Sequence, residues 1–288
     1  MKKIVLFTIL LAGAASAQTP FQVKVSGHGQ PMILIPGLAS TGETWDTTVA
    51  HYQDRYECHV LTLAGFGGLP RIASPMLDTV RDGIAEYIRK NRLERPVIVG
   101  HSLGGFLALA VAAKYPGLPG KLVIVDSYPF LPGVWNAGAT AADVKQAVAQ
   151  SRQFYRSQDQ DTYERMTKSG VSTRPMVTKD SDLERLIAWG LASDRTAVAD
   201  AMIELMEGDL REDIARIKSP TLVMASWIGY KDYTTREKIE DGLRRQYAKL
   251  AGASLQVSGT ARHFIMWDDP NWMFSQMDSF LGVRQAAK

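Results

Sequence analysis

The sequence has a single cysteine, Cys58, among 288 residues. A disulfide within the chain is therefore excluded, and the fold must be stabilised by its hydrophobic core. Apolar residues make up 45% of the chain, which is enough to build such a core. Cys58 lies in a hydrophobic strand pattern, so we expect a small buried side chain there and no catalytic thiol.

The chain also lacks a strong excess of charge of either sign. It has 33 basic and 30 acidic residues, and two of the basic ones, Lys2 and Lys3, belong to its first few positions. The other basic residues are scattered and do not alternate with aromatic residues, as they would in a nucleic-acid groove. We therefore expect a small-molecule substrate and no nucleic-acid partner.

Motifs for metals and phosphate-bearing cofactors are missing as well. The sequence contains no H-E-x-x-H motif and no closely spaced pair of His or Cys residues. Gly37 and Gly42 have the glycine spacing of a phosphate loop and Thr44 fits its last position, but Glu43 stands where the motif requires Lys. We expect neither a metal nor a cofactor.

Long apolar runs are absent except at the start of the chain. Lys2 and Lys3 precede an apolar run of 12 residues, 4–15, and Ala15, Ser16 and Ala17 form a small-residue cleavage site. The run is shorter than the roughly 20 residues needed to span a bilayer. Residues 1–17 are therefore predicted to be a signal peptide. We expect an exported protein, periplasmic or secreted, with no transmembrane segment after cleavage.

Beyond residue 18, short β-rich runs alternate with helical patterns, which predicts an α/β fold with a mostly parallel sheet and helices on both faces. One such pattern places Leu77, Val80, Ile84 and Ile88 on a single helical face. The alternation stops between residues 128 and 215, where only helical patterns occur, so this stretch is predicted to be an inserted all-helical cap. The core would comprise residues 18–127 and 216–288. The expected strands are 21–26, 32–35, 58–63, 97–100, 122–125, 221–225 and 254–257.

The strongest chemical signal is the segment from Gly100 to Gly104, which fits the nucleophile motif G-x-S-x-G with Ser102 at its centre. It follows an apolar strand and opens an apolar helix, the context that the motif requires. Glycines two residues before and after the serine permit a strained turn that exposes the hydroxyl. Ser102 is therefore predicted to be a catalytic nucleophile.

A serine nucleophile needs a base, usually a histidine that a carboxylate orients. Of the five histidines, His263 lies in a loop after the last predicted strand, where open α/β sheets place their sites. His101 adjoins Ser102 and is expected to point elsewhere. Two acids compete to orient His263, and both precede it as the chain order requires. We favour Asp232, which follows the penultimate strand, over Asp126, which ends the strand at 122–125.

Taken together, the chain from Pro31 to Leu281 resembles the α/β-hydrolase superfamily, as a serine esterase-like member with a helical cap. The resemblance rests on LIPGLAS, GFGG, GHSLGG, PTLVMA and RHFIMWDDP, in this order along the chain. It implies an oxyanion hole formed by the backbone N–H groups of Leu38 and Leu103. Many members have histidine where this chain has Pro36. Related dehalogenases and epoxide hydrolases have aspartate at the nucleophile position, where this chain has Ser102.

These observations predict an exported serine hydrolase that cleaves a small carboxylic ester or lactone through an acyl-enzyme on Ser102. Two alternatives remain open, because a fold does not determine its substrate. The same residues could act on amide or C–C bonds. A ligand-binding or receptor-like relative could also retain them with little turnover.

Overall fold

The computed structural model describes residues 19–283. A seven-stranded sheet forms the centre of the molecule, with the strand order β1-β3-β2-β4-β5-β6-β7. Only β1 runs antiparallel to its neighbour, β3, and the other pairs are parallel. The strands are β1 Phe21–Gly27, β2 Gln30–Ile35, β3 Tyr56–Leu63, β4 Val97–His101, β5 Lys121–Val125, β6 Thr221–Ala225 and β7 Ser254–Val257. All seven predicted strands are confirmed, and so is the α/β class.

Helices cover both faces of the sheet, and alternate residues of each strand divide between them. One core lies under α2 Met76–Lys90, α3 Leu103–Lys114 and α8 Arg236–Gln246, and the other lies under α1 Asp46–Tyr52 and α10 Pro270–Leu281. In β2, Ile33 and Ile35 belong to the first core, whereas Met32 and Leu34 belong to the second. The predicted apolar face of α2 is buried as expected. The short helix α9 Ile265–Asp268 precedes α10.

Cys58 lies fully buried in the second of these cores. Burial raises the pKa of its thiol to about 11. The thiol is therefore protonated at neutral pH, in agreement with the expected structural role.

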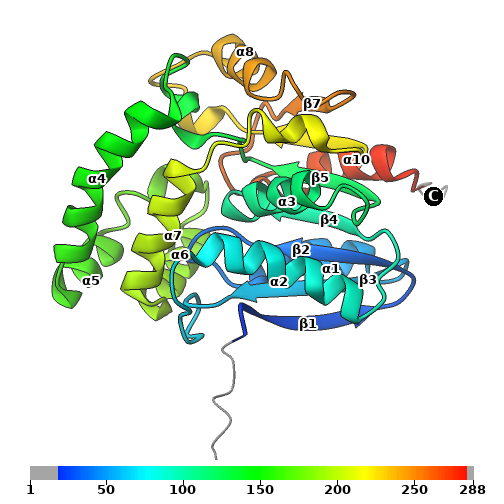
Figure 1. Cartoon of the computed structure of the whole chain (residues 1–288), viewed down its shortest axis with the longest axis horizontal. Helices are drawn as coiled ribbons and strands as arrows, with labels where there is room; N and C mark the ends of the chain where they lie inside the picture. The colour runs from blue at the N-terminus through cyan, green and yellow to red at the C-terminus, as the bar shows by residue number, and fades with distance from the viewer. Residues whose placement is uncertain (1–18, 284–288) are drawn as a thin grey trace, which may run out of the picture.

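In the described residues between β5 and β6, helices are joined by loops and there is no strand. The α-helices are α4 Ala141–Ser157, α5 Gln160–Ser169, α6 Asp180–Ala192 and α7 Arg195–Glu207, and they lie together at the left of the sheet in Figure 1. We call this stretch the helical insertion. Its helices agree with the all-helical segment expected from the sequence. The limits of this segment at residues 128 and 215, and its role as a cap over a site, stay predictions.

The helical insertion packs on loops at the carboxyl end of the sheet. The N–H of Gly68, after β3, donates to Ala192 O at 2.9 Å, and the N–H of Phe264, after β7, donates to Met176 O at 3.2 Å. From α7, the Glu204 carboxylate accepts the N–H groups of Met76 and Leu77 at 2.9 and 2.7 Å. The insertion therefore bridges loops that follow strands on opposite sides of β4.

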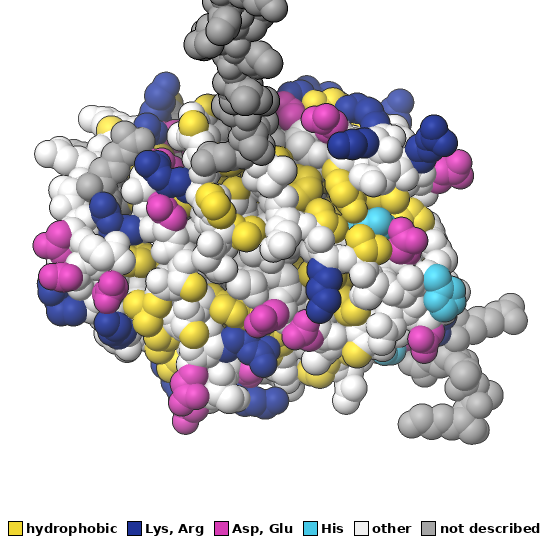
Figure 2. Space-filling view, turned by 90° about the horizontal axis from the view of Figure 1, so that it is seen from below, with side chains coloured by type: hydrophobic (Ala, Val, Ile, Leu, Met, Phe, Trp, Pro, Cys, Tyr) yellow, Lys and Arg dark blue, Asp and Glu magenta, His cyan; other side chains and the backbone are white. Residues whose placement is uncertain are grey.

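Charged side chains are interspersed on the face of the molecule seen in Figure 2, where Lys and Arg lie among Asp and Glu. Within residues 19–283, no helix is both long and apolar enough to cross a bilayer. The predicted signal peptide, residues 1–17, lies outside the described residues.

Candidate active site

Ser102 occupies a sharp turn between β4 and α3, with φ 53° and ψ −120°. Two glycines make the turn possible. A Cβ atom at Gly100 would lie 2.2 Å from Gly104 O, and one at Gly104 would lie 2.2 Å from Ile35 O. Of residues 96–113, Ser102 alone is not buried. The strained turn therefore presents one hydroxyl from an otherwise buried strand and helix, as the sequence motif predicts.

His263 lies in the loop between β7 and α9, with its ring against a carboxylate. Its Nδ1 is 2.6 Å from Oδ2 of Asp126, which directly follows β5 and is buried. Ser226 supports the same carboxylate, since its N–H donates to Oδ1 at 2.7 Å and its hydroxyl donates to Oδ2 at 2.9 Å. A carboxylate facing Nδ1 keeps the proton on that nitrogen and leaves Nε2 free to act as a base.

The expectation that Asp232 orients His263 is wrong in this structure. Asp232 is exposed in the turn after Ile228–Tyr230, and its carboxylate makes no bond to His263. The reason lies in the strand order. β5 is the neighbour of β4, the Ser102 N–H donates to Val125 O at 2.9 Å, and Asp126 is the next residue after Val125. The acid on the adjacent strand is therefore at the site, whereas the loop after β6 contributes Ser226 to support it.

The two predicted oxyanion donors flank this turn. Leu103 is the first residue of α3, so its N–H has no acceptor within the helix. Gly37, the neighbour of Leu38, is packed so closely that a Cβ atom there would lie 3.2 Å from Ser102 Cβ. In the described structure, neither the Leu38 N–H nor the Leu103 N–H donates a hydrogen bond to another residue. Their role as an oxyanion hole stays a prediction, and both groups are available for it.

His101 is at the site, although the sequence predicted that it would point elsewhere. Its side chain is fully buried, and its Nε2 is 3.1 Å from the backbone oxygen of His263. Burial, reinforced by the nearby His263, holds the pKa of His101 well below its usual value. The imidazole is therefore neutral at physiological pH. A long-range contact of this kind leaves no signal in the local sequence.

Two tyrosines near Asp126 were also missed by the sequence reasoning. Burial, together with the charge of Asp126, raises the pKa values of Tyr128 and Tyr230. Both phenols therefore remain protonated and can only be neutral donors or acceptors. Tyr128 follows Asp126 by two residues, so choosing Asp126 as the acid would have indicated that Tyr128 lies near the site.

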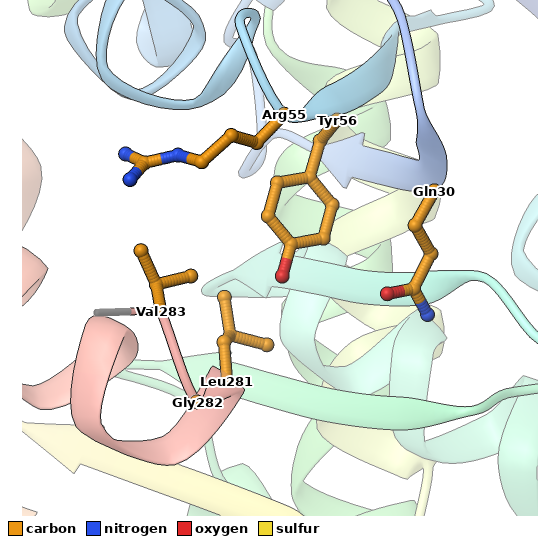
Figure 3. Close-up of a pocket in the computed structure, with 6 residues that line it drawn as sticks. All are labelled: Gln30, Arg55, Tyr56, Leu281, Gly282 and Val283. Carbon is orange, nitrogen blue, oxygen red and sulfur yellow. The ribbon is translucent and has the colours of Figure 1, made fainter.

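Two hollows lie away from Ser102. One, of about 300 Å³, lies at the amino ends of β2 and β3, where Gln30, Arg55 and Tyr56 face the end of α10 (Figure 3). The other, of about 470 Å³, lies between Gly68 and the start of α7. Neither is lined by Ser102, His263 or Asp126. Among the described residues, no group of three or more His, Cys, Asp or Glu side chains could hold a metal ion.

The chain is similar to proteins of known activity and structure. A pimeloyl-[acyl-carrier protein] methyl ester esterase of Vibrio cholerae is 26% identical over 206 residues, which cover 69% of this chain and 76% of that protein. An N-formylmaleamate deformylase of Pseudomonas putida is 23% identical over 286 residues, covering 95% and 97%. The crystal structure of an enol-lactonase from Burkholderia xenovorans LB400 matches with a TM-score of 0.73 at 16% identity, covering 91% and 96%.

The model of the family described as "Alpha/beta hydrolase family" matches residues 32–276, which include every part of the site described above. This match spans most of the chain, and the two relatives named above, an esterase and a deformylase, are hydrolases. The chain belongs to the alpha/beta hydrolase family and is a hydrolase.

Proposed function

We propose that this protein is an exported serine hydrolase that cleaves a small carboxylic ester or lactone through an acyl-enzyme on Ser102. The observation that carries the proposal is the 2.6 Å contact between His263 Nδ1 and Asp126, the residue after Val125, whose oxygen accepts the N–H of the partly exposed Ser102. It supplies a nucleophile, a base and an orienting acid. The esterase activity of the Vibrio cholerae relative supports the choice of an ester.

In the proposed reaction, Ser102 Oγ attacks the carbonyl carbon while His263 Nε2 accepts the hydroxyl proton. The N–H groups of Leu38 and Leu103 stabilise the negative oxygen of the tetrahedral intermediate, and each such donor contributes about 3 kcal/mol. The C–O bond to the alcohol then breaks, and His263 returns the proton to the leaving oxygen. Water activated by His263 hydrolyses the acyl-enzyme and releases the acid.

A second candidate is the hydrolysis of a small amide. The similarity to N-formylmaleamate deformylase runs over 95% of this chain, a larger share than the similarity to the esterase. The same three residues serve this reaction, because acyl transfer from an amide differs only in the leaving nitrogen.

The test is to purify the protein and label it with a fluorophosphonate, which should add one phosphonyl group to the peptide that carries Ser102. Turnover is then measured on p-nitrophenyl esters of increasing acyl length, on lactones and on N-formyl amides. Ser102→Ala should lower kcat by about 10⁶-fold. Repeated turnover of an ester or lactone supports the proposal, and turnover of amides alone favours the second candidate. Labelling without turnover would instead indicate a ligand-binding protein.

Export is a separate part of the proposal and has its own test. Cleavage after Ala17 would leave Gln18 as the first residue. N-terminal sequencing of the protein recovered from outside the cytoplasm should therefore begin at Gln18. Recovery only from the cytoplasm with Met1 in place would contradict export and leave the assigned chemistry intact.

A further inference from the structure

We propose that His101 is a positioning residue, which holds the main-chain carbonyl of His263 and thereby fixes the catalytic imidazole relative to Ser102. This inference rests on the proposed function, because it assigns His263 as the base. His101 precedes Ser102 directly, so the nucleophile and this contact to the base belong to the same turn.

The hydrogen bond determines which tautomer His101 adopts. Its Nε2 is 3.1 Å from His263 O, and a carbonyl oxygen can only accept. Nε2 therefore carries the proton and donates it, whereas Nδ1 is unprotonated and has no partner among the described residues. The bond joins positions 162 residues apart and links the nucleophile turn to the loop after β7.

His263 is thereby held at two points within residues 19–283. Asp126 holds Nδ1 of the ring at 2.6 Å, and His101 holds the backbone oxygen at 3.1 Å. The first contact fixes the rotation of the ring, and the second fixes the main chain from which the ring projects. The residues on either side are also anchored, since the Arg262 N–H donates to Asp268 at 2.9 Å and the Phe264 N–H donates to Met176 O at 3.2 Å. The bond from His101 sets the carbonyl of His263 itself, between these two anchors, and so helps to place Nε2.

The surroundings of His101 leave its ring one position. Its centroid lies 4.5 Å from that of His263, 4.5 Å from that of Phe264 and 6.5 Å from that of Trp45. On another side, a Cβ atom at Gly37 would lie 3.1 Å from His101 Nδ1. Close packing on these sides keeps Nε2 directed at the carbonyl, as a supporting group requires.

A neutral donor also suits the chemistry. His263 becomes a cation when it accepts the proton of Ser102, and a second positive charge in a buried neighbouring ring would oppose that step. His101, buried and neutral, gives the hydrogen bond without the charge. An amide side chain should therefore replace it better than any charged donor.

The test uses a matched pair of amides. His101→Gln keeps a neutral N–H donor near the position of Nε2, whereas the shorter side chain in His101→Asn does not reach the carbonyl. We expect kcat to fall about 10²-fold in the Asn variant with KM within about twofold, because small misplacement of a catalytic group costs this much. The Gln variant should recover most of kcat. Values are taken per Ser102 titrated with fluorophosphonate, so that unfolded protein does not contribute.

A second readout keeps this inference separate from the proposed function. The rate constant for fluorophosphonate labelling of Ser102 depends on His263 but requires no natural substrate, and it should follow the same order: wild type, Gln, then Asn. If the wild type is labelled but turns over no ester, lactone or amide, the proposed function fails and the labelling rates still decide the role of His101. Equal labelling rates and equal kcat in Gln and Asn, with both proteins folded by circular dichroism, would overturn the inference.

Discussion

Asp126 and Asp232 offer a direct test of the site at the level of single residues. Asp126→Asn should lower kcat by about 10⁴-fold, because the amide favours the wrong tautomer of His263. Asp232→Asn is the matched control, since its side chain is exposed and makes no bond to His263. The measurement is kcat for both variants on one ester, with thermal unfolding to confirm that each is folded.

The opposite result would assign the orienting carboxylate to Asp232, in the loop after β6. A loss of orders of magnitude in Asp232→Asn, together with near-normal activity in Asp126→Asn, would mean that His263 changes partner when substrate binds. Comparable small losses in both variants would show that His263 needs no carboxylate.

The buried histidines predict how stability changes with pH. Burial lowers the pKa values of His101 and His59 in the folded protein. In the unfolded chain an imidazole binds a proton near pH 6.5, whereas these two stay neutral in the fold until the pH is lower. The free energy of unfolding should therefore fall as the pH drops below about 6.5, by at most 1.4 kcal/mol per pH unit for each histidine.

Urea unfolding between pH 7.5 and 5 measures this slope, with His101→Gln as the comparison. Removing one of the two buried histidines should make the slope shallower over this range. An unchanged slope in His101→Gln would mean that His101 does not contribute to the acid sensitivity, which would then come from His59 and the carboxylates.

At the scale of an element, the turn between β4 and α3 depends on backbone contacts too close for any side chain. A Cβ atom at Gly104 would meet Ile35 O at 2.2 Å, and neither backbone can yield without disturbing β2 or α3. Gly104→Ala should therefore lower the free energy of unfolding by about 1–3 kcal/mol. Gly117→Ala is the control, because a Cβ atom there has nothing within 4 Å. Equal unfolding midpoints for the two variants would show that the turn relaxes.

The sequence predicted most of the elements correctly because their signals are local. Apolar runs located all seven strands, and the spacing of Leu77, Val80, Ile84 and Ile88 gave the buried face of α2. α10 begins at Pro270 after Asp269, whose side chain accepts the Trp272 N–H, and both residue types are local start signals. These signals depend on neighbours within one or two turns of the chain, so no tertiary information was needed.

Contacts between distant segments were beyond the same reasoning. His263 meets Asp126 across 137 residues, and chain order alone allowed Asp232 equally well. The choice depends on β5 lying beside β4, which no local pattern encodes. The contact of His101 with the His263 carbonyl was missed for the same reason.

At the scale of the whole molecule, the helical insertion and the core share a partly buried helix cap. Glu204 in α7 accepts the N–H groups of Met76 and Leu77, which would otherwise have no partner at the start of α2. Glu204→Gln removes the charge that favours this end of the helix dipole. We expect the free energy of unfolding to fall by about 1 kcal/mol.

Glu212→Gln is the control for this change, because Glu212 pairs with Lys249 on the exposed surface, where an ion pair contributes little. Thermal unfolding of the two variants makes the comparison. If Glu212→Gln destabilises the protein as much as Glu204→Gln does, the bonds from Glu204 to the start of α2 contribute no more to stability than a surface charge does.

Ser102 and Asp126 share a feature with Ala39, beside Leu38: each is a non-glycine residue with positive φ, at 53°, 44° and 51°. Such positions cost about 1–3 kcal/mol each, in a fold whose net stability is of the order of 10 kcal/mol. Glycine would adopt these conformations without strain. If Ser102 and Asp126 act as proposed, their side chains are retained for the reaction at a cost in stability. A descendant of this chain that had lost the reaction would gain stability by drifting toward glycine at these three places. Glycine at these three positions would then indicate the loss of function as clearly as the absence of the serine does.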